Sequence, residues 1–171
     1  MRSADDKASL RGFTLLEILI VIAIVGILVA IAVGNFGGLN EKYKVEAETK
    51  QLFSDLMDAR GRAMQRNRAS FVQVNGNDYQ TYEDTSPAPD GDGALQNTDT
   101  LIIDAKVSHA IATGNIAVPL IFNFNRNGIA SVTGFIRLSS TGQPDYDCIW
   151  IRATRIKMGQ YNATGNTCAE K

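Results

Sequence analysis

The N-terminal part of the chain divides sharply into a polar and an apolar segment. The first twelve residues are polar, and positions 13–36 contain Glu17 as their only charged residue. A helix of this length extends about 36 Å, which is enough to cross roughly 30 Å of hydrocarbon. The favourable insertion of many Leu, Ile, Val and Phe side chains outweighs the cost of one acid near the end of the segment. The pattern therefore predicts a membrane-spanning helix that carries a single carboxylate.

The same helix is predicted to continue through residues 37–68, where apolar positions recur at a spacing of three and four. Charged residues fill most of the other positions, so we expect one face of this segment to lie on a globular domain and the other in water. The side chains predicted to face the domain are Val45, Leu52, Phe53, Leu56, Met57, Ala59, Ala63 and Met64.

Several glycines interrupt the long helix, among them Gly26 and Gly34. Glycine destabilises a helix interior by about 1 kcal/mol relative to alanine. We therefore expect the helix to bend or locally unwind at these two positions. For Gly26, close approach of a second helix in lipid is an equally good interpretation.

Beyond residue 68 the pattern changes to short apolar runs separated by turn residues, which is typical of strands. The sequence Asn75-Gly76-Asn77-Asp78 predicts a hairpin, Asn127-Gly128 predicts a tight turn, and residues 84–99 are expected to form a long surface loop. The fold class is therefore α+β, with one long helix laid across a small antiparallel sheet. The predicted strands are 70–74, 79–82, 101–107, 117–124, 129–132, 135–138 and 148–152.

The composition fits one anchor segment and one domain. The chain has 171 residues and a formal net charge of −1, so its overall charge does not indicate a nucleic-acid-binding protein. The charges are nevertheless segregated: seven acids and no base lie between positions 78 and 104, and six bases with two acids lie between 106 and 157. Such asymmetry can direct the packing of subunits, although two solvated faces are the simpler explanation.

Patterns of catalytic or metal-binding residues are scarce. His109 is the sole histidine, and no acid or nucleophile stands at a motif spacing from it. The chain has no Walker loop, no CxxC pair and no nucleophile elbow. The run Asp90-Gly91-Asp92-Gly93 lacks the further acids of a calcium loop, so we expect a flexible loop there. We predict neither an enzymatic activity nor a bound metal or cofactor.

The segment Gly12-Phe13-Thr14-Leu15-Leu16-Glu17 resembles the class III signal of type IV prepilins and of type II secretion pseudopilins. The resemblance implies that a prepilin peptidase cleaves after Gly12 and methylates the new N-terminal Phe13. It also implies that Glu17 pairs with the N-terminal amine of a neighbouring subunit during filament assembly. In lipid an unpaired carboxylate and an unpaired ammonium are both costly, and pairing relieves both. A plain membrane anchor that contains one acid is the alternative.

The resemblance also implies a topology and a set of partners. Basic residues beside a membrane segment favour the cytoplasmic side. The leader 1–12 is therefore expected in the cytoplasm, the helix 13–36 in the bacterial inner membrane, and the rest of the chain in the periplasm before it enters a filament. The expected partners are other pilin or pseudopilin subunits, the prepilin peptidase, the inner-membrane assembly platform and membrane lipid.

Three segments of the C-terminal half are similar to the GspH/FimT domain, namely 124–128, 134–138 and 149–157. Thr154 stands where that family has a glycine in its final motif. The family includes minor pilins that prime or cap type IV pili and minor pseudopilins of type II secretion. The resemblance implies the type IV pilin fold, with the amphipathic half of the helix at 37–68 and a β-rich globular domain at 69–171. It favours a minor pilin, with a minor pseudopilin as the alternative.

Cys148 and Cys168 are the only cysteines, and the expected topology puts both outside the cytoplasm, where disulfides persist. A bond between them resembles the C-terminal disulfide of type IV pilins, which favours a pilus over a secretion filament. It would close a loop of about 20 residues and contribute about 3 kcal/mol of stability in the chain-entropy model.

Arg152, Arg155 and Lys157 form a basic cluster in the sequence beside Trp150 and Tyr161. Basic residues with aromatic neighbours can hold a nucleic-acid backbone and stack its bases. Some FimT-type minor pilins bind DNA through a basic C-terminal motif, so DNA is a further candidate partner. Three charges are a small footprint, however, and alternate residues of a strand face opposite ways, which would turn Arg152 away from Arg155. A subunit contact or a solvated patch is therefore the favoured interpretation.

Overall fold

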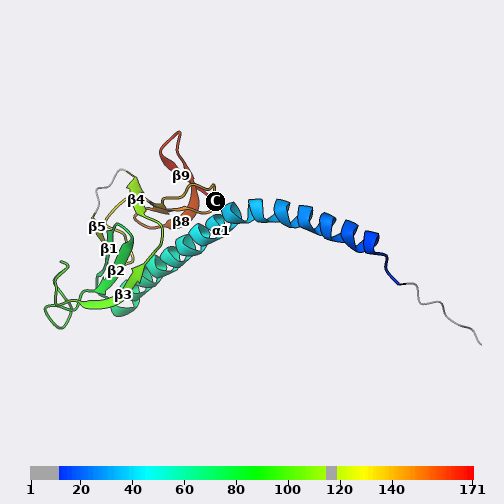
Figure 1. Cartoon of the computed structure of the whole chain (residues 1–171). Helices are drawn as coiled ribbons and strands as arrows, with labels where there is room; N and C mark the ends of the chain where they lie inside the picture. Colours follow the sequence, from blue (N-terminus) through cyan, green and yellow to red (C-terminus); the bar gives the residue numbers. More distant parts are fainter. Residues whose placement is uncertain (1–11, 115–118) are drawn as a thin grey trace, which may run out of the picture. The chain divides into compact units, whose positions relative to one another are not determined.

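The computed structural model describes residues 12–114 and 119–171, and for residues 32–37 it describes the backbone only. The chain forms two compact units, Met1–Leu39 and Asn40–Lys171. The described residues form one helix, α1 (Leu15–Arg66), and nine strands, which confirms the α+β class (Figure 1). Most of the predicted leader, residues 1–11, lies outside the described residues.

The helix α1 is one uninterrupted element, as the sequence predicted. Its backbone is helical at both Gly26 and Gly34, so the flexibility expected at these positions stays a prediction. The helix ends at Arg66, and the next residue, Asn67, adopts the left-handed conformation (φ 57°) that commonly terminates helices.

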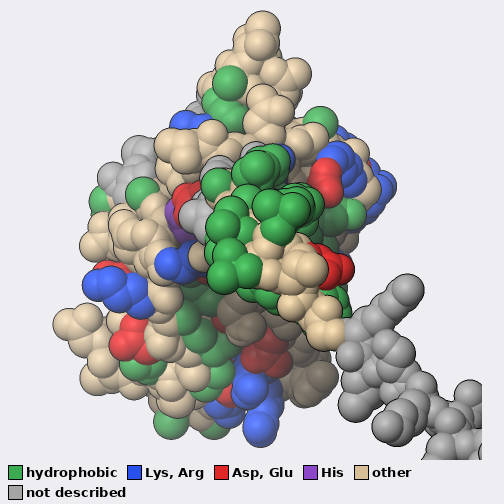
Figure 2. Space-filling model, turned by 45° about the vertical axis from the view of Figure 1, so that its right-hand side comes forward, with side chains coloured by type: hydrophobic (Ala, Val, Ile, Leu, Met, Phe, Trp, Pro, Cys, Tyr) green, Lys and Arg blue, Asp and Glu red, His purple; other side chains and the backbone are tan. Residues whose placement is uncertain are grey.

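In the first unit, the apolar side chains of α1 are open to the surroundings. Leu15 is 83% exposed, and each large apolar side chain described between Ile18 and Ile31 is at least 50% exposed. Figure 2 shows hydrophobic side chains gathered on the face that it displays. The part of α1 between Leu15 and Ile31 therefore offers an apolar surface to other molecules. Among the described residues, the structure contains no helix whose length and apolar character would suffice to cross a membrane.

The second unit contains two antiparallel sheets where the sequence predicted one. The strand order is β3-β2-β1-β5 in the first sheet and β4-β6-β7-β8-β9 in the second. A bridge between Phe124 and Ala130 links the end of β5 to the segment before β6. The strands are β1 (Ser70–Asn75), β2 (Asp78–Glu83), β3 (Thr100–Lys106), β4 (Ile111–Gly114), β5 (Leu120–Phe124), β6 (Gly134–Leu138), β7 (Cys148–Ile151), β8 (Ile156–Asn162) and β9 (Thr167–Glu170).

Most of the predicted strands are confirmed, and the hairpin of β1 and β2 turns at Gly76 and Asn77 as expected. The predicted strand 129–132 is wrong, because this short run lies in the connection between β5 and β6 and pairs only through the single bridge at Ala130. The strands β4, β8 and β9 were not predicted from the sequence. Of these, β4 is four residues long, and β8 and β9 carry mostly polar side chains, so none has a strong apolar alternation.

One face of α1 forms a wall of the hydrophobic core. In Figure 1 the part of α1 that belongs to the second unit lies alongside β1, β2 and β3. Thr49 is also fully buried, and its hydroxyl donates a hydrogen bond to the Val45 carbonyl at 2.8 Å. The prediction was wrong for Met57 and Met64, which are 40% and 49% exposed because they lie off the buried stripe. The confirmed core positions of the helix are Val45, Leu52, Leu56, Ala59 and Ala63, each at most 1% exposed.

Charged side chains of α1 hold loops of the second unit. Arg60 donates from Nε to the Gly128 carbonyl at 2.8 Å and from a terminal nitrogen to the Thr154 carbonyl at 2.9 Å. Glu46 accepts a hydrogen bond from the backbone N–H of Asp145 at 3.0 Å. These helix positions were predicted to lie in water, because the residue pattern does not show which loops return to the helix.

Two buried aspartates organise the loop at residues 84–99. Asp84 is 2% exposed and accepts hydrogen bonds from the backbone N–H groups of Gly93 at 2.8 Å and Asp92 at 3.3 Å. Asp99 is 7% exposed and accepts three more such bonds. The run 90–93, expected to be flexible, is therefore tied to the loop interior. The donors to Asp99 are the backbone N–H groups of Thr85, Ser86 and Gln96.

Candidate functional site

The helix α1 begins at Leu15, so Phe13 and Thr14 lie just before it and Glu17 lies in its first turn. The Thr14 hydroxyl accepts a hydrogen bond from the backbone N–H of Glu17 at 3.2 Å, which is the geometry of an N-terminal helix cap. The spacing Thr-x-x-Glu is also that of a capping box, and an acid in the first turn is favoured by the helix dipole. Thr14 thus caps the start of the helix, and the Glu17 carboxylate lies in its first turn. This cap was not predicted from the sequence, although the Thr-x-x-Glu spacing signals it.

The side chains at this end of the helix are accessible. Phe13 is 79% exposed, and a Cβ placed on Gly12 would meet no atom within 4 Å. Within residues 12–114 and 119–171, no cation comes within ion-pair distance of Glu17. Its carboxylate is therefore open to a cation on another molecule. The roles of Gly12 and Phe13 in processing stay predictions.

Arg152, Arg155 and Lys157, here named the basic edge, converge on one carboxylate of β9. Their nitrogens lie 3.2, 3.0 and 3.3 Å from oxygens of Glu170. The expectation that Arg152 points away from Arg155 is wrong. These two residues exchange backbone hydrogen bonds across the turn between β7 and β8, so their side chains leave the same face. Lys157 follows two residues later and shares that face.

The positive charge of the basic edge is partly neutralised by the carboxylate of Glu170. Burial raises the pKa of Glu170, but the hydrogen bond from Lys157 and the two guanidinium charges outweigh this and lower it. One carboxylate therefore faces three cations, which leaves two positive charges in excess. The Arg152 guanidinium also lies 5.5 Å from the centre of the Trp150 ring. Sequence reasoning missed Glu170, because it lies on a strand that was not predicted.

Cys148 and Cys168 form the expected disulfide, with an S–S distance of 2.01 Å. It joins β7 to β9, and Gly159 of the intervening β8 lies beside it. A Cβ at Gly159 would lie 2.1 Å from the Ala169 carbonyl oxygen and 3.1 Å from the Cys168 sulfur, so this position requires glycine. Around the disulfide is a second, smaller core that includes Phe135, Trp150 and Tyr161.

A polar hollow of about 550 Å³ lies on the second sheet, lined in part by Arg137, Asp147 and Tyr161. The Arg137 guanidinium lies 4.1 Å from the centre of the Tyr161 ring. The Asp147 carboxylate accepts a hydrogen bond from the backbone N–H of Tyr161 at 2.6 Å. Burial raises the pKa of Asp147 more than this bond lowers it. These groups contact one another, which is the arrangement of a structural polar cluster.

Comparisons with known proteins address the N-terminus and the fold separately. Residues 9–33 match the family model described as the prokaryotic N-terminal methylation motif. Among solved structures, the minor pseudopilin EpsH from the type 2 secretion system of Vibrio cholerae is similar to this chain with a TM-score of 0.51 and 8% identity. The similarity covers 68% of this chain and 97% of that chain. No curated protein matches the sequence.

At 8% identity, the likeness to EpsH concerns the fold: a long N-terminal helix packed on antiparallel strands. The methylation motif is an independent finding, since it rests on residues 9–33 of the sequence. Taken together, the chain carries a prokaryotic N-terminal methylation motif at residues 9–33, and its fold is similar to that of a minor pseudopilin.

Proposed function

We propose that this chain is a minor type IV pilin that primes or caps pilus assembly as part of a tip complex. The observation that supports the proposal best is the combination found at the N-terminus. A methylation motif coincides with a helix that has outward apolar side chains and one carboxylate, Glu17, without an ion-pair partner in the described residues. Packing of such helices against one another would bury their apolar surface, which favours association.

In this proposal a prepilin peptidase removes residues 1–12 and methylates Phe13. The new amine then precedes Glu17 by four residues, which is about 6 Å along a helix. The amine and the carboxylate stay near the same end of every subunit, so two staggered subunits can each supply one group of an ion pair. In a water-free environment such a pair relieves two uncompensated charges.

Before assembly, we propose that residues 13–36 cross the bacterial inner membrane once, with the leader in the cytoplasm and the globular unit in the periplasm. The chain would meet its assembly platform and other pilin subunits there. The disulfide between Cys148 and Cys168 supports the periplasmic side, because disulfides persist in oxidising compartments.

The second candidate is a minor pseudopilin of a type II secretion filament. The fold likeness to EpsH favours it, whereas the C-terminal disulfide favours the pilus through its resemblance to pilins. Crosslinking in the native host, followed by identification of the bound subunits, separates the two. Recovery of pilus subunits supports the first candidate, and recovery of pseudopilins supports the second.

The role of Glu17 is tested by three variants that separate its charge from its position in the helix cap. Glu17→Ala removes both features, Glu17→Gln keeps a capping-box side chain without charge, and Thr14→Ala removes the cap hydroxyl and keeps the charge. The proposal expects both Glu17 variants to reach the membrane and to fail in filament incorporation. The Thr14 variant should still be incorporated, with a helix destabilised by about 1 kcal/mol.

Incorporation is measured by blotting sheared filaments and membranes for the chain. Incorporation of Glu17→Gln at the wild-type level would mean that the charge is not needed, and would overturn the pairing mechanism. A defect shared by Glu17→Gln and Thr14→Ala would instead assign the effect to the helix start.

DNA binding at the basic edge is a third candidate. The convergence of three cations on one face favours it, and the Glu170 carboxylate among them opposes it. A mobility-shift assay at low salt tests it directly. If DNA binds, Arg155→Ala and Lys157→Ala should weaken binding, and Glu170→Gln should strengthen it by removing the competing charge. Absence of any shift with wild type and Glu170→Gln would remove this role.

A further inference from the structure

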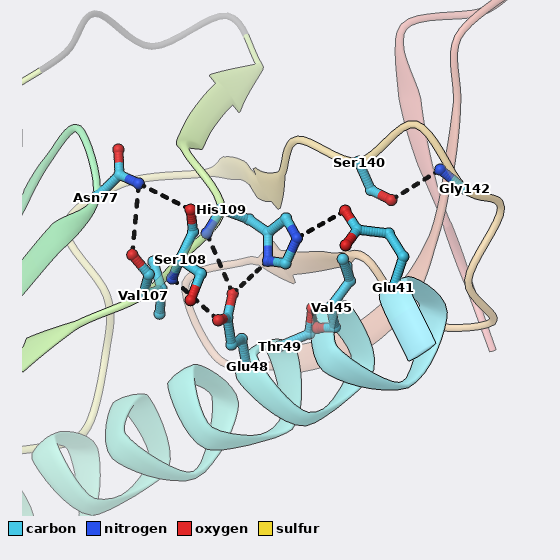
Figure 3. Close-up of polar contacts among 10 residues, drawn as sticks. All are labelled: Glu41, Val45, Glu48, Thr49, Asn77, Val107, Ser108, His109, Ser140 and Gly142. Atoms are coloured by element: carbon cyan, nitrogen blue, oxygen red, sulfur yellow. Dashed lines mark hydrogen bonds and ion pairs between the residues drawn. The ribbon is translucent and has the colours of Figure 1, made fainter. Parts of the chain in front are cut away.

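The single histidine joins α1 to the connection between β3 and β4 (Figure 3). His109 Nδ1 lies 2.6 Å from a Glu48 carboxylate oxygen, and Nε2 lies 2.8 Å from a Glu41 oxygen. The imidazole is only 11% exposed. Both ring nitrogens therefore face carboxylates, and both can donate a hydrogen bond only when the ring is protonated.

Glu48 is also held by hydrogen bonds that do not depend on the protonation of the His109 imidazole. Its carboxylate also accepts hydrogen bonds from the backbone N–H groups of Ser108 at 2.9 Å and His109 at 3.3 Å. The Asn77 side chain holds the same connection by donating to the Ser108 carbonyl at 3.2 Å. Among the described residues, the Glu41 carboxylate has no hydrogen bond or ion pair other than the contact with His109. Loss of the imidazole proton therefore affects Glu41 first.

The charged groups that face the imidazole are Glu41 and Glu48, both on α1. The turn between β1 and β2 contributes the neutral Asn77. The segment after β6 contributes only a backbone bond, from the N–H of Ser139 to the Ala110 carbonyl at 2.8 Å. Beside this region, Lys106 and Asp78 pair with each other at 3.7 Å. Two carboxylates on the helix thus set the charge environment of the ring.

We propose that the Glu41–His109–Glu48 bridge is a proton-controlled latch on the first helical turn of the second unit, which begins at Asn40. With the ring protonated, both carboxylates are held. With the ring neutral, Nδ1–H stays on Glu48, and Nε2 presents a lone pair to the Glu41 carboxylate. The lone pair and the Glu41 carboxylate then repel each other. The attachment of α1 to the rest of the second unit then begins at the buried Val45 instead of Glu41.

The direction of the pH dependence follows from the two partners. Burial lowers the pKa of His109, but the bonds to Glu48 and Glu41 outweigh this and raise it above 6.5. This stabilisation is complete below pH 6.5 and is lost as pH rises through the raised pKa. Burial raises the pKa of Glu48, but its bonds to His109 and Ser108 lower it below 4.5, so its contribution is lost only as pH falls through that lower pKa. The latch is therefore closed in mildly acidic solution and opens on the alkaline side.

The first measurement is an NMR titration of the imidazole in the full-length chain in detergent micelles. The chain has one histidine, so its ring signals need no assignment among others. The latch requires a titration midpoint above 6.5 in wild type and a lower midpoint in Glu41→Gln, by about one unit. A wild-type midpoint at or below 6.5 would overturn the proposal.

The second measurement follows hydrogen exchange of the backbone amides of residues 41–45, expressed as protection relative to unstructured peptide at each pH. Wild type should lose several-fold protection as pH rises through the imidazole midpoint. In Glu41→Gln the amide can donate to the neutral ring, so protection should be independent of pH in this window. The matched control is Glu46→Gln, which changes a helix carboxylate bonded to Asp145 and should retain the wild-type pH dependence.

Protection of residues 41–45 that stays constant in wild type would contradict the latch, as would the same pH response in Glu41→Gln. If Glu41→Gln fails to fold, the wild-type titration and the Glu46→Gln control still decide the question. Neither measurement involves filament assembly, so the latch and the proposed pilin function can fail independently.

Discussion

The phenol of Tyr79 donates a hydrogen bond to the carboxylate of Asp55 at 2.5 Å and thereby ties β2 to α1 within the core. Tyr79 is 1% exposed and Asp55 is 9% exposed. Gln51 supplies a second bond to the same carboxylate at 3.0 Å. A buried carboxylate is costly unless it is hydrogen-bonded, so this pair is a polar contact on which the seating of the helix depends.

Replacement of Tyr79 by Phe should reduce the free energy of unfolding by about 1–3 kcal/mol, because it leaves the Asp55 carboxylate without its shortest bond. Denaturant unfolding followed by circular dichroism measures the loss. Tyr82→Phe is the matched control, since the Tyr82 hydroxyl bonds Gln80 at a partly exposed site and its removal should cost less. Equal losses in the two variants would contradict the role given to Asp55.

The same pair predicts resistance to ionisation in alkali. Burial and the bond to Asp55 raise the pKa of Tyr79 above its ordinary value of 10.0. The stability that the neutral Tyr79 hydroxyl contributes is therefore complete below pH 10 and is lost as pH rises through the raised pKa. Absorbance of the phenolate should show one of the five tyrosines ionising only when the protein unfolds. Ionisation of all five in the folded protein would show that the hydroxyl of Tyr79 is not held.

Loss of the disulfide should weaken the C-terminal part of the second sheet. A double variant, Cys148→Ala with Cys168→Ala, should lose about 3 kcal/mol of unfolding free energy in the chain-entropy model. A reducing agent should lower the melting temperature of wild type and leave that of the double variant unchanged. A wild-type protein that is insensitive to reduction would show that the bond does not contribute to stability.

Gly91 should tolerate no side chain, because a Cβ there would lie 1.9 Å from the Asp84 carboxylate oxygen and the residue has a positive φ of 77°. Gly91→Ala should therefore destabilise the protein by about 1–3 kcal/mol. Gly93→Ala is the control: Gly93 has a similar φ of 82°, but a Cβ would meet no atom within 4 Å. The difference between the two variants in thermal unfolding isolates the contact with Asp84, and no difference would mean that the aspartate moves freely.

The helix and its buried face were predictable because they depend on local spacing. Leu52, Leu56, Ala59 and Ala63 repeat at helical intervals, and that repeat is visible without knowledge of the rest of the fold. Asp84 and Asp99 were not predictable in the same way, because their partners are backbone N–H groups of a loop whose path no residue pattern defines. Buried carboxylates in such loops look like solvent-exposed charges in a sequence.

The candidate sites divide in the same way, into features that are contiguous in the sequence and contacts that only the folded chain creates. The leader motif around Gly12 and Glu17 is contiguous in sequence, and the pairing of two lone cysteines needs no geometry. The basic edge was found as a cluster, but its counter-ion Glu170 lies 13 residues beyond Lys157 on a strand with little apolar pattern. The contacts of His109 with Glu41 and Glu48 span more than sixty residues, so only the folded chain shows them.

The most direct test of the proposed function is the intact mass of the protein isolated from the membranes of its native host, with Gly12→Ser as the control. The proposal predicts a wild-type chain that begins at Phe13 and carries one added methyl group, and a Gly12→Ser chain that keeps residues 1–12. A wild-type mass that still includes residues 1–12, or an unmethylated terminus at another position, would contradict it.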